Sequence, residues 1–150
     1  MKRITSVLAV FALTIGMVQA RPMPIRFSQL PEVVQAYAKQ YFPLGDNDYR
    51  NAYVTYDEEM PEAAYTIVFT VGDGLEFRSN NELKVYECHS KGVPATILPE
   101  AVAQAVQAGH PNTRIEKFEV VRISLTALTY EITLADGSVT TYDEAGQVVE

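Results

Sequence analysis

The stretch of sequence that decides the fold occurs twice, as LPEVVQAYAKQYFP at residues 30–43 and as LPEAVAQAVQAGHP at residues 98–111. In both copies apolar residues recur three and four positions apart, which places them on one face of a helix. Ser28 and Thr96 stand just before the two copies and are expected to be helix N-caps. A proline fits the first turn of a helix, and the closing proline ends it. The sequence therefore predicts two helices of one design.

Strand-like segments follow each predicted helix. Tyr, Val, Ile, Phe and Thr are frequent in residues 50–57 and 63–71, and again in residues 114–124 and 128–134. Two shorter apolar segments complete each half, and turns rich in Gly, Asp or Asn separate them. Each half thus reads as one helix followed by four strands. Because the connections are short, the strands are expected to pair antiparallel.

The two halves also match in sequence. DGLEFRSNNELKVYE at residues 73–87 aligns without gaps with DGSVTTYDEAGQVVE at residues 136–150. This match indicates an internal duplication, with one repeat over about 28–88 and a second over about 96–150. The expected fold class is α+β, with tandem α-β-β-β-β repeats and two helices packed on one face of an antiparallel sheet of up to eight strands.

The first 20 residues have the three-part layout of a secretory signal peptide. Lys2 and Arg3 precede an apolar run, and small residues precede an expected cleavage after Ala20. The run, residues 4–18, is shorter than the roughly 20 residues needed to cross a bilayer. We therefore expect a periplasmic or secreted protein whose mature domain, residues 21–150, has no transmembrane segment.

The charge balance argues against nucleic acid as a partner. The whole chain has a formal net charge of −7, and removing Lys2 and Arg3 makes it −9. Binding to phosphate needs clustered Lys and Arg, and the basic residues of this chain are scattered singly along the sequence.

Neither a metal site, nor another cofactor, nor a catalytic centre is expected. Cys88 is the only cysteine, so it cannot form an internal disulfide, and we expect it to be a buried or edge-of-strand thiol. Cys88 and His89 are adjacent on a predicted strand, where neighbours point to opposite faces, so they cannot easily bind one ion. The only other histidine is His110, and no nucleophile motif accompanies either histidine.

Tyrosine is the unusual feature of the composition, because the chain has nine Tyr and no Trp. Tyr49, Tyr53 and Tyr56 cluster around the first predicted strand of the first half. Tyrosine is favoured at interfaces, although on strands it also packs against neighbouring strands. These three residues are the candidate protein-binding residues, and the water-facing side of the sheet is the expected binding face.

The chain resembles the PepSY-like family, also described as β-lactamase-inhibitor-like proteins, which are exported to the bacterial cell envelope. The resemblance covers residues 28–150 as two repeats. It rests on the helix starts, helix ends, turns and strand ends at Leu30-Pro31, Phe42-Pro43, Leu98-Pro99, Asp136-Gly137, Tyr142-Asp143, Gly146 and Val148. The family implies an exported, non-enzymatic binding domain.

The expected function is therefore a non-catalytic periplasmic or secreted binding module. Its partner would be an envelope protein or a peptide, and it would act as an inhibitor of, or an adaptor for, an envelope protein or peptidase. The alternative is a carrier of a small apolar ligand in the cell envelope, which requires a cavity of several hundred cubic ångströms between helices and sheet.

Overall fold

The computed structural model describes residues 23–42, 44–50, 53–56, 64–69 and 72–149. The expected signal peptide and its cleavage site lie outside these residues. Within the described ranges, no helix is both long enough and apolar enough to span a membrane.

The described chain forms strands, α-helices and two single-turn 3₁₀ helices. In order these are β1 (Met23–Ile25), η1 (Phe27–Gln29), α1 (Glu32–Tyr41), α2 (Asp46–Arg50), β2 (Tyr53–Tyr56), β3 (Tyr65–Val68), β4 (Gly74–Phe77), β5 (Leu83–Glu87), η2 (Ala95–Ile97), α3 (Glu100–Gly109), β6 (Ile115–Arg122), β7 (Leu128–Leu134) and β8 (Val139–Tyr142).

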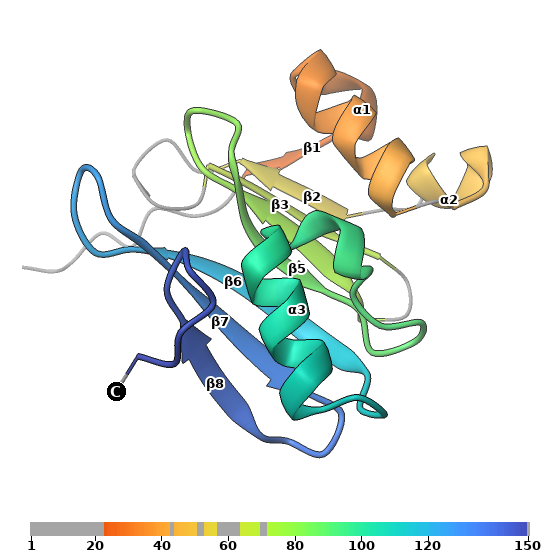
Figure 1. The fold of residues 1–150 in the computed structure, drawn as a ribbon. Helices are drawn as coiled ribbons and strands as arrows, with labels where there is room; N and C mark the ends of the chain where they lie inside the picture. Colours follow the sequence, from red (N-terminus) through yellow and green to blue (C-terminus); the bar gives the residue numbers. More distant parts are fainter. Residues whose placement is uncertain (1–22, 43, 51–52, 57–63, 70–71, 150) are drawn as a thin grey trace, which may run out of the picture.

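The strands form one sheet in which each strand pairs antiparallel with the next along the chain, from β1 to β8. Helices α1 and α3 lie on the same side of this sheet, with α1 toward β1 and β2 and α3 in front of the middle strands (Figure 1). The predicted α+β class with an antiparallel sheet is therefore confirmed.

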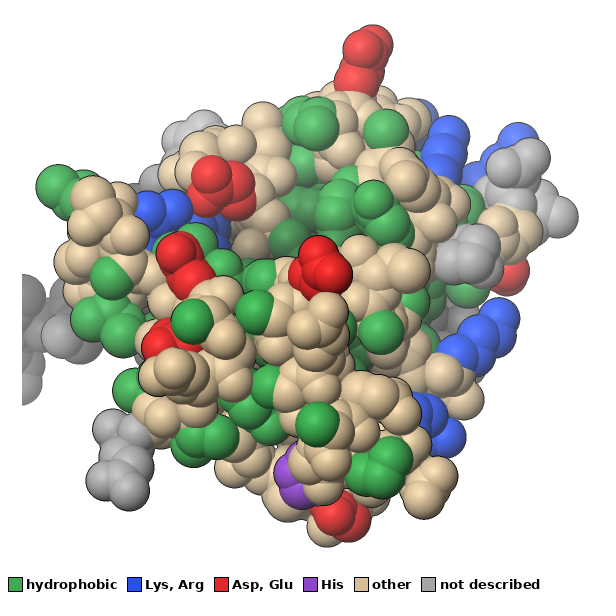
Figure 2. All heavy atoms as spheres, viewed as in Figure 1, with side chains coloured by type: hydrophobic (Ala, Val, Ile, Leu, Met, Phe, Trp, Pro, Cys, Tyr) green, Lys and Arg blue, Asp and Glu red, His purple; other side chains and the backbone are tan. Residues whose placement is uncertain are grey.

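The core lies between the helices and the sheet. A row of apolar side chains, each no more than 2% exposed, crosses five neighbouring strands through register partners Ile67, Leu75, Tyr86, Phe118 and Ile132. Buried valines of α1 and α3 belong to the same apolar cluster. Figure 2 shows hydrophobic side chains in the hollow between the two helices, and Lys and Arg side chains toward the edges of this face.

Both repeated stretches form ten-residue helices, but the predicted N-caps were wrong. Ser28 and Thr96 lie inside the two 3₁₀ helices, and the N-caps are Pro31 and Pro99, which make no side-chain cap hydrogen bond. The leucine before each proline is extended, because a residue that precedes proline avoids the helical region. Each helix therefore begins directly after its proline.

Three other segments differ from the prediction. Residues 23–25, for which the sequence predicted no strand, form β1, in which Pro24 is tolerated because β1 is an edge strand. Residues 46–50, for which the sequence predicted no helix, form the short helix α2. The last expected strand is reduced to one isolated bridge between Tyr142 and Val148. Among the described residues, the first half thus supplies five strands and the second half three, and the tandem repeat stays a prediction.

The turn after β8 packs against α3. Gly146 has φ of +75°, and a Cβ at this position would collide with the carbonyl oxygen of Ala101 in α3 and touch Ala105. Gly137, in the turn between β7 and β8, has a similar φ of +84° but nothing within 4 Å of its Cβ position. Gly146 therefore permits both a left-handed turn and a close approach to the helix.

We expect Gly146→Ala to destabilise the protein more than Gly137→Ala. Gly137→Ala adds only left-handed strain, about 1 kcal/mol, whereas Gly146→Ala also forces the turn away from α3, about 2 kcal/mol more. Urea denaturation of both variants measures the difference. Equal losses of unfolding free energy would show that the turn does not press on α3.

Asp73 connects the turn between β3 and β4 to the chain that follows β5. Its side chain is fully buried, and its carboxylate accepts hydrogen bonds from the His89 N–H at 2.8 Å, the Ser90 hydroxyl and the Cys88 thiol at 3.5 Å. Burial by itself would raise the pKa of Asp73, but these hydrogen bonds outweigh it and hold the pKa below its usual value. Asp73 is therefore a buried, ionised anchor.

Asp73→Asn is expected to lower the free energy of unfolding by about 2 kcal/mol at pH 7, because charge-assisted hydrogen bonds are lost. Because the pKa of Asp73 is lower in the folded protein than in the unfolded chain, the carboxylate stabilises the fold at pH values above its unfolded-state pKa. This stabilisation is lost as the pH falls through the pKa that Asp73 has in the folded protein. The gap between wild type and variant should therefore shrink below about pH 4. Urea denaturation at pH 7, 5 and 3 measures it.

Asp136→Asn is the matched control, because Asp136 also accepts hydrogen bonds in a turn but its side chain is exposed. Its effect should be much smaller. If Asp73→Asn lowers the free energy of unfolding by the same amount from pH 7 to pH 3, Asp73 is not ionised in the folded protein.

Candidate functional site

Of the three candidate tyrosines, Tyr49 lies in the core rather than on a surface. It is 5% exposed, and its ring centroid is 4.8 Å from that of Phe27. Its hydroxyl donates to the carbonyl oxygens of Phe42 and, at 3.2 Å, Ala38, and accepts from the Leu44 N–H. Tyr49 thus satisfies backbone groups where α1 ends, a role that the spacing of tyrosines in the sequence did not indicate.

Tyr53 and Tyr56 belong to β2, where they pair with Val68 and Tyr65 of β3. The structure describes their backbone but not their side chains. Contact between these tyrosines and a partner therefore stays a prediction.

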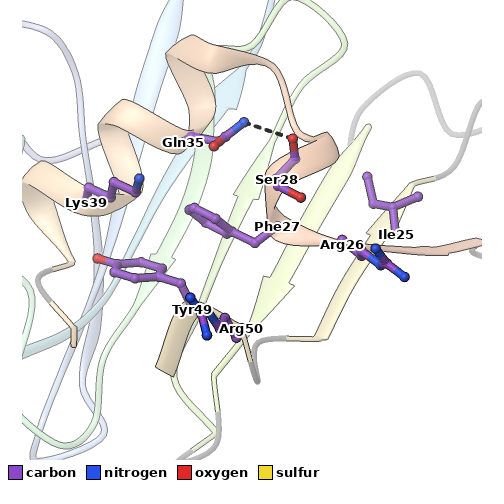
Figure 3. Close-up of a pocket in the computed structure, with 8 residues that line it drawn as sticks. All are labelled: Ile25, Arg26, Phe27, Ser28, Gln35, Lys39, Tyr49 and Arg50. Carbon is purple, nitrogen blue, oxygen red and sulfur yellow. Dashed lines mark hydrogen bonds between the residues drawn. The ribbon is translucent and has the colours of Figure 1, made fainter. Parts of the chain in front are cut away.

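A pocket of about 540 Å³ opens beside Tyr49, between η1, α1 and α2 (Figure 3). Segments that are distant in the sequence supply its wall: α1 contributes two polar side chains, α2 contributes two more, and the chain around η1 contributes the rest. The residues that line it are Ile25, Arg26, Phe27, Ser28, Gln35, Lys39, Tyr49 and Arg50.

Local hydrogen bonds hold the wall of this pocket in place. The Gln35 side-chain amide donates to the carbonyl oxygens of Leu30 at 2.8 Å and Ser28 at 3.4 Å, so α1 is tied to η1. The Arg26 N–H donates to the Gln29 side chain at 2.8 Å, which closes the η1 turn. These hydrogen bonds hold η1 and the start of α1 in one arrangement.

Three cations surround the pocket, namely Arg26, Lys39 and Arg50, and all three are exposed. Among the described residues, none of the three makes a salt bridge. The basic side chains that do form salt bridges lie elsewhere on the described surface: Lys84, His89, Arg114, Lys117 and Arg122. Within the described part of the chain, the pocket is therefore a local concentration of positive charge without salt-bridge partners. The three cations are far apart in the sequence, so only the fold brings them around one pocket.

Cys88 and His89 do not form a joint site. Cys88 is buried, as predicted. The His89 ring is exposed between Glu87, at 2.6 Å, and Glu116, at 3.0 Å. Hydrogen bonds to these two carboxylates raise the pKa of His89, and hydrogen bonds from Arg114 and His89 lower the pKa of Glu116. In the part of the chain that the structure describes, no group of three or more His, Cys, Asp or Glu residues is arranged to hold a metal ion.

The fold matches solved structures of bacterial periplasmic proteins. One, from Bacteroides vulgatus and described as a "putative periplasmic protein", shares 26% identity, with a TM-score of 0.71 over 86% of this chain and 94% of that chain. A second protein from the same organism, described as of unknown function, shares 22% identity, with a TM-score of 0.70 over 87% and 98% of the two chains.

A third, from Bacteroides thetaiotaomicron and described as a "putative calcium-regulated periplasmic protein", shares 21% identity, with a TM-score of 0.69 over 86% and 94% of the two chains. The search of curated proteins gave no match. A family model described as "Putative beta-lactamase-inhibitor-like, PepSY-like" matches residues 63–150. Because this match spans more than half of the 150 residues, the chain belongs to the PepSY-like family.

Proposed function

We propose that the mature protein is a non-catalytic, exported binding module. It holds an acidic segment of an envelope protein or of a peptide in the pocket between η1, α1 and α2, and it acts there as an inhibitor or adaptor. The observation that carries this proposal is the set of three cations around one pocket, none of which makes a salt bridge with a described residue, in a chain of net charge −7.

The chemistry of the pocket fits an acidic polypeptide segment. Arg26 and Arg50 offer planar guanidinium groups that bind carboxylates in bidentate fashion, and Lys39 adds a mobile point charge. The buried rings of Phe27 and Tyr49 form an apolar part of the same wall, against which an aliphatic side chain can pack. Exposed ion pairs each contribute roughly 0.2–1 kcal/mol, so three of them give modest, salt-sensitive binding.

The edge of the sheet lies beside this pocket. Ile25, the last residue of β1, lines the pocket, and β1 is the first strand of the sheet order. A segment that enters the pocket therefore passes an edge strand, where backbone hydrogen bonds are available to a peptide. This route differs from the sheet face around Tyr53 and Tyr56, which stays an alternative binding surface.

The binding proposal predicts a strong response to charge reversal. A labelled hexaglutamate peptide should bind the mature protein at low salt, and the triple variant Arg26→Glu, Lys39→Glu and Arg50→Glu should bind at least tenfold more weakly. Fluorescence anisotropy at 20 mM and 500 mM salt measures the affinity for the peptide. The higher salt concentration should weaken binding to the wild type but not to the triple variant.

Lys91→Glu is the matched control, because Lys91 is also exposed and makes no salt bridge among the described residues, yet lies outside this pocket. Its affinity should stay within twofold of wild type. Equal losses for Lys91→Glu and for a single reversal at Arg50 would place the binding elsewhere.

Export is part of the same proposal. It is supported by the three-part N-terminus and by the description of the structural neighbours as periplasmic proteins. Expression of the full chain in a bacterium should yield envelope-fraction protein that begins at Arg21, as read by N-terminal sequencing. Protein that begins at Met1 and stays with the cytoplasmic fraction would refute export.

We also propose that the chain arose by internal duplication. The support is local: both repeated stretches form a 3₁₀ turn, an extended leucine and proline, and a ten-residue helix. The residues that end the two helices also have similar backbone angles, with φ and ψ of −124° and 69° at Phe42 and −138° and 61° at His110. An experimental structure in which residues 27–42 and 95–110 fail to superpose would contradict it.

A further inference from the structure

A second cavity, of about 470 Å³, lies where α1 ends and where the chain leaves β5 toward η2. Its size falls in the range of pockets that hold one small molecule. It shares no lining residue with the cation-lined pocket described above. The cavity is lined by Tyr41, Phe42, Leu44, Asp73, Tyr86, Cys88, Ser90, Lys91, Gly92, Val93 and Pro94.

The wall of this cavity is mostly apolar and is held rigidly. The Tyr86 hydroxyl donates to the Tyr41 carbonyl oxygen at 2.6 Å, which joins β5 to the end of α1. The Phe42 ring stacks on Phe69 with centroids 4.2 Å apart. On the other side, the Val93 N–H donates to the Ile115 carbonyl oxygen at 2.8 Å. Because this wall is already ordered, the binding of an apolar group would cost little conformational entropy of the protein.

The polar end of the cavity presents hydrogen-bond acceptors. Asp73 is 0% exposed, and its carboxylate already accepts hydrogen bonds from Cys88, His89 and Ser90, so it contributes negative charge rather than a free acceptor. The Ser90 hydroxyl is exposed and donates its proton to that carboxylate, so its oxygen can accept a hydrogen bond from a ligand. A ligand with a hydroxyl or an ammonium group therefore meets the Ser90 oxygen, with the charge of Asp73 behind it, whereas a carboxylate is repelled by that charge. Lys91, at the cavity rim, is exposed to water.

We propose that this cavity is a binding site for one small apolar molecule that carries a hydrogen-bond donor. The apolar body lies against Phe42, Leu44 and Val93, and the donor points toward the Ser90 oxygen. This site is independent of the proposed binding of acidic segments, because the two cavities have no residue in common.

Three probes with the same phenyl body test the site: 2-phenylethanol, 2-phenylethylamine and phenylacetate. Titration of the ¹⁵N-labelled mature protein should shift the amide signals of Gly92 and Val93 with the alcohol and the amine, and at least tenfold less with phenylacetate. The amide signal of Gly137, in a distant exposed turn, should not move. Equal shifts with all three probes, or no shift with any of them, would overturn the proposal.

Two variants locate the binding. Leu44→Trp fills the cavity from its rim and should abolish the shifts at Gly92 and Val93, while Ser90→Ala removes an acceptor and should weaken 2-phenylethanol about fivefold. Thermal unfolding confirms that each variant is folded. Arg50→Glu, which changes only the other pocket, should leave these titrations unchanged. Shifts that persist in folded Leu44→Trp would show that the probes bind elsewhere.

Discussion

A continuous antiparallel sheet with one apolar face must hide that face from water, and this requirement governs the rest of the molecule. The row Ile67, Leu75, Tyr86, Phe118 and Ile132 crosses five strands and belongs to both halves of the chain. Two ten-residue helices cover it, each about 15 Å long. Because neither helix can cover the row alone, the two halves share one core and form a single unit.

The same requirement explains where the two cavities lie. Short helices leave parts of the covered face to loops and single turns, and both cavities lie beside α1, one against η1 and α2 and the other where α1 ends. Beside η1 and α2 the closure leaves an opening with exposed cations. At the second cavity, Tyr86 and Asp73 close the core with hydrogen bonds, and an apolar space remains between them and the segment before η2. Both openings thus lie where loops and single turns complete the cover of the core.

Buried polar groups hold the loops at the edges of the core in place. Tyr49 satisfies carbonyl groups at the end of α1, and Asp73 satisfies donors that follow β5. In the described part of the chain, no buried side-chain nitrogen or oxygen lacks a hydrogen-bond partner. A buried polar group without a hydrogen-bond partner costs about 1–3 kcal/mol of stability. Apolar contacts alone would allow many arrangements of the loops, and these hydrogen bonds favour the one in which every buried polar group has a partner. The loops around both cavities are therefore defined by polar contacts more than by packing.

The sequence by itself determined the two helices, the alternating strands and the antiparallel pairing, because periodicity, proline positions and short turns are local signals. It did not reveal β1 or α2, since a three-residue edge strand that contains a proline and a five-residue helix depend on the neighbours that cover them. Tyr49 matched an interface pattern, and only the tertiary structure placed it in the core. Arg26, Lys39 and Arg50 are scattered along the sequence, and only the packing of η1, α1 and α2 brings them around one pocket. Their proximity depends on tertiary contacts, which a local sequence pattern does not show.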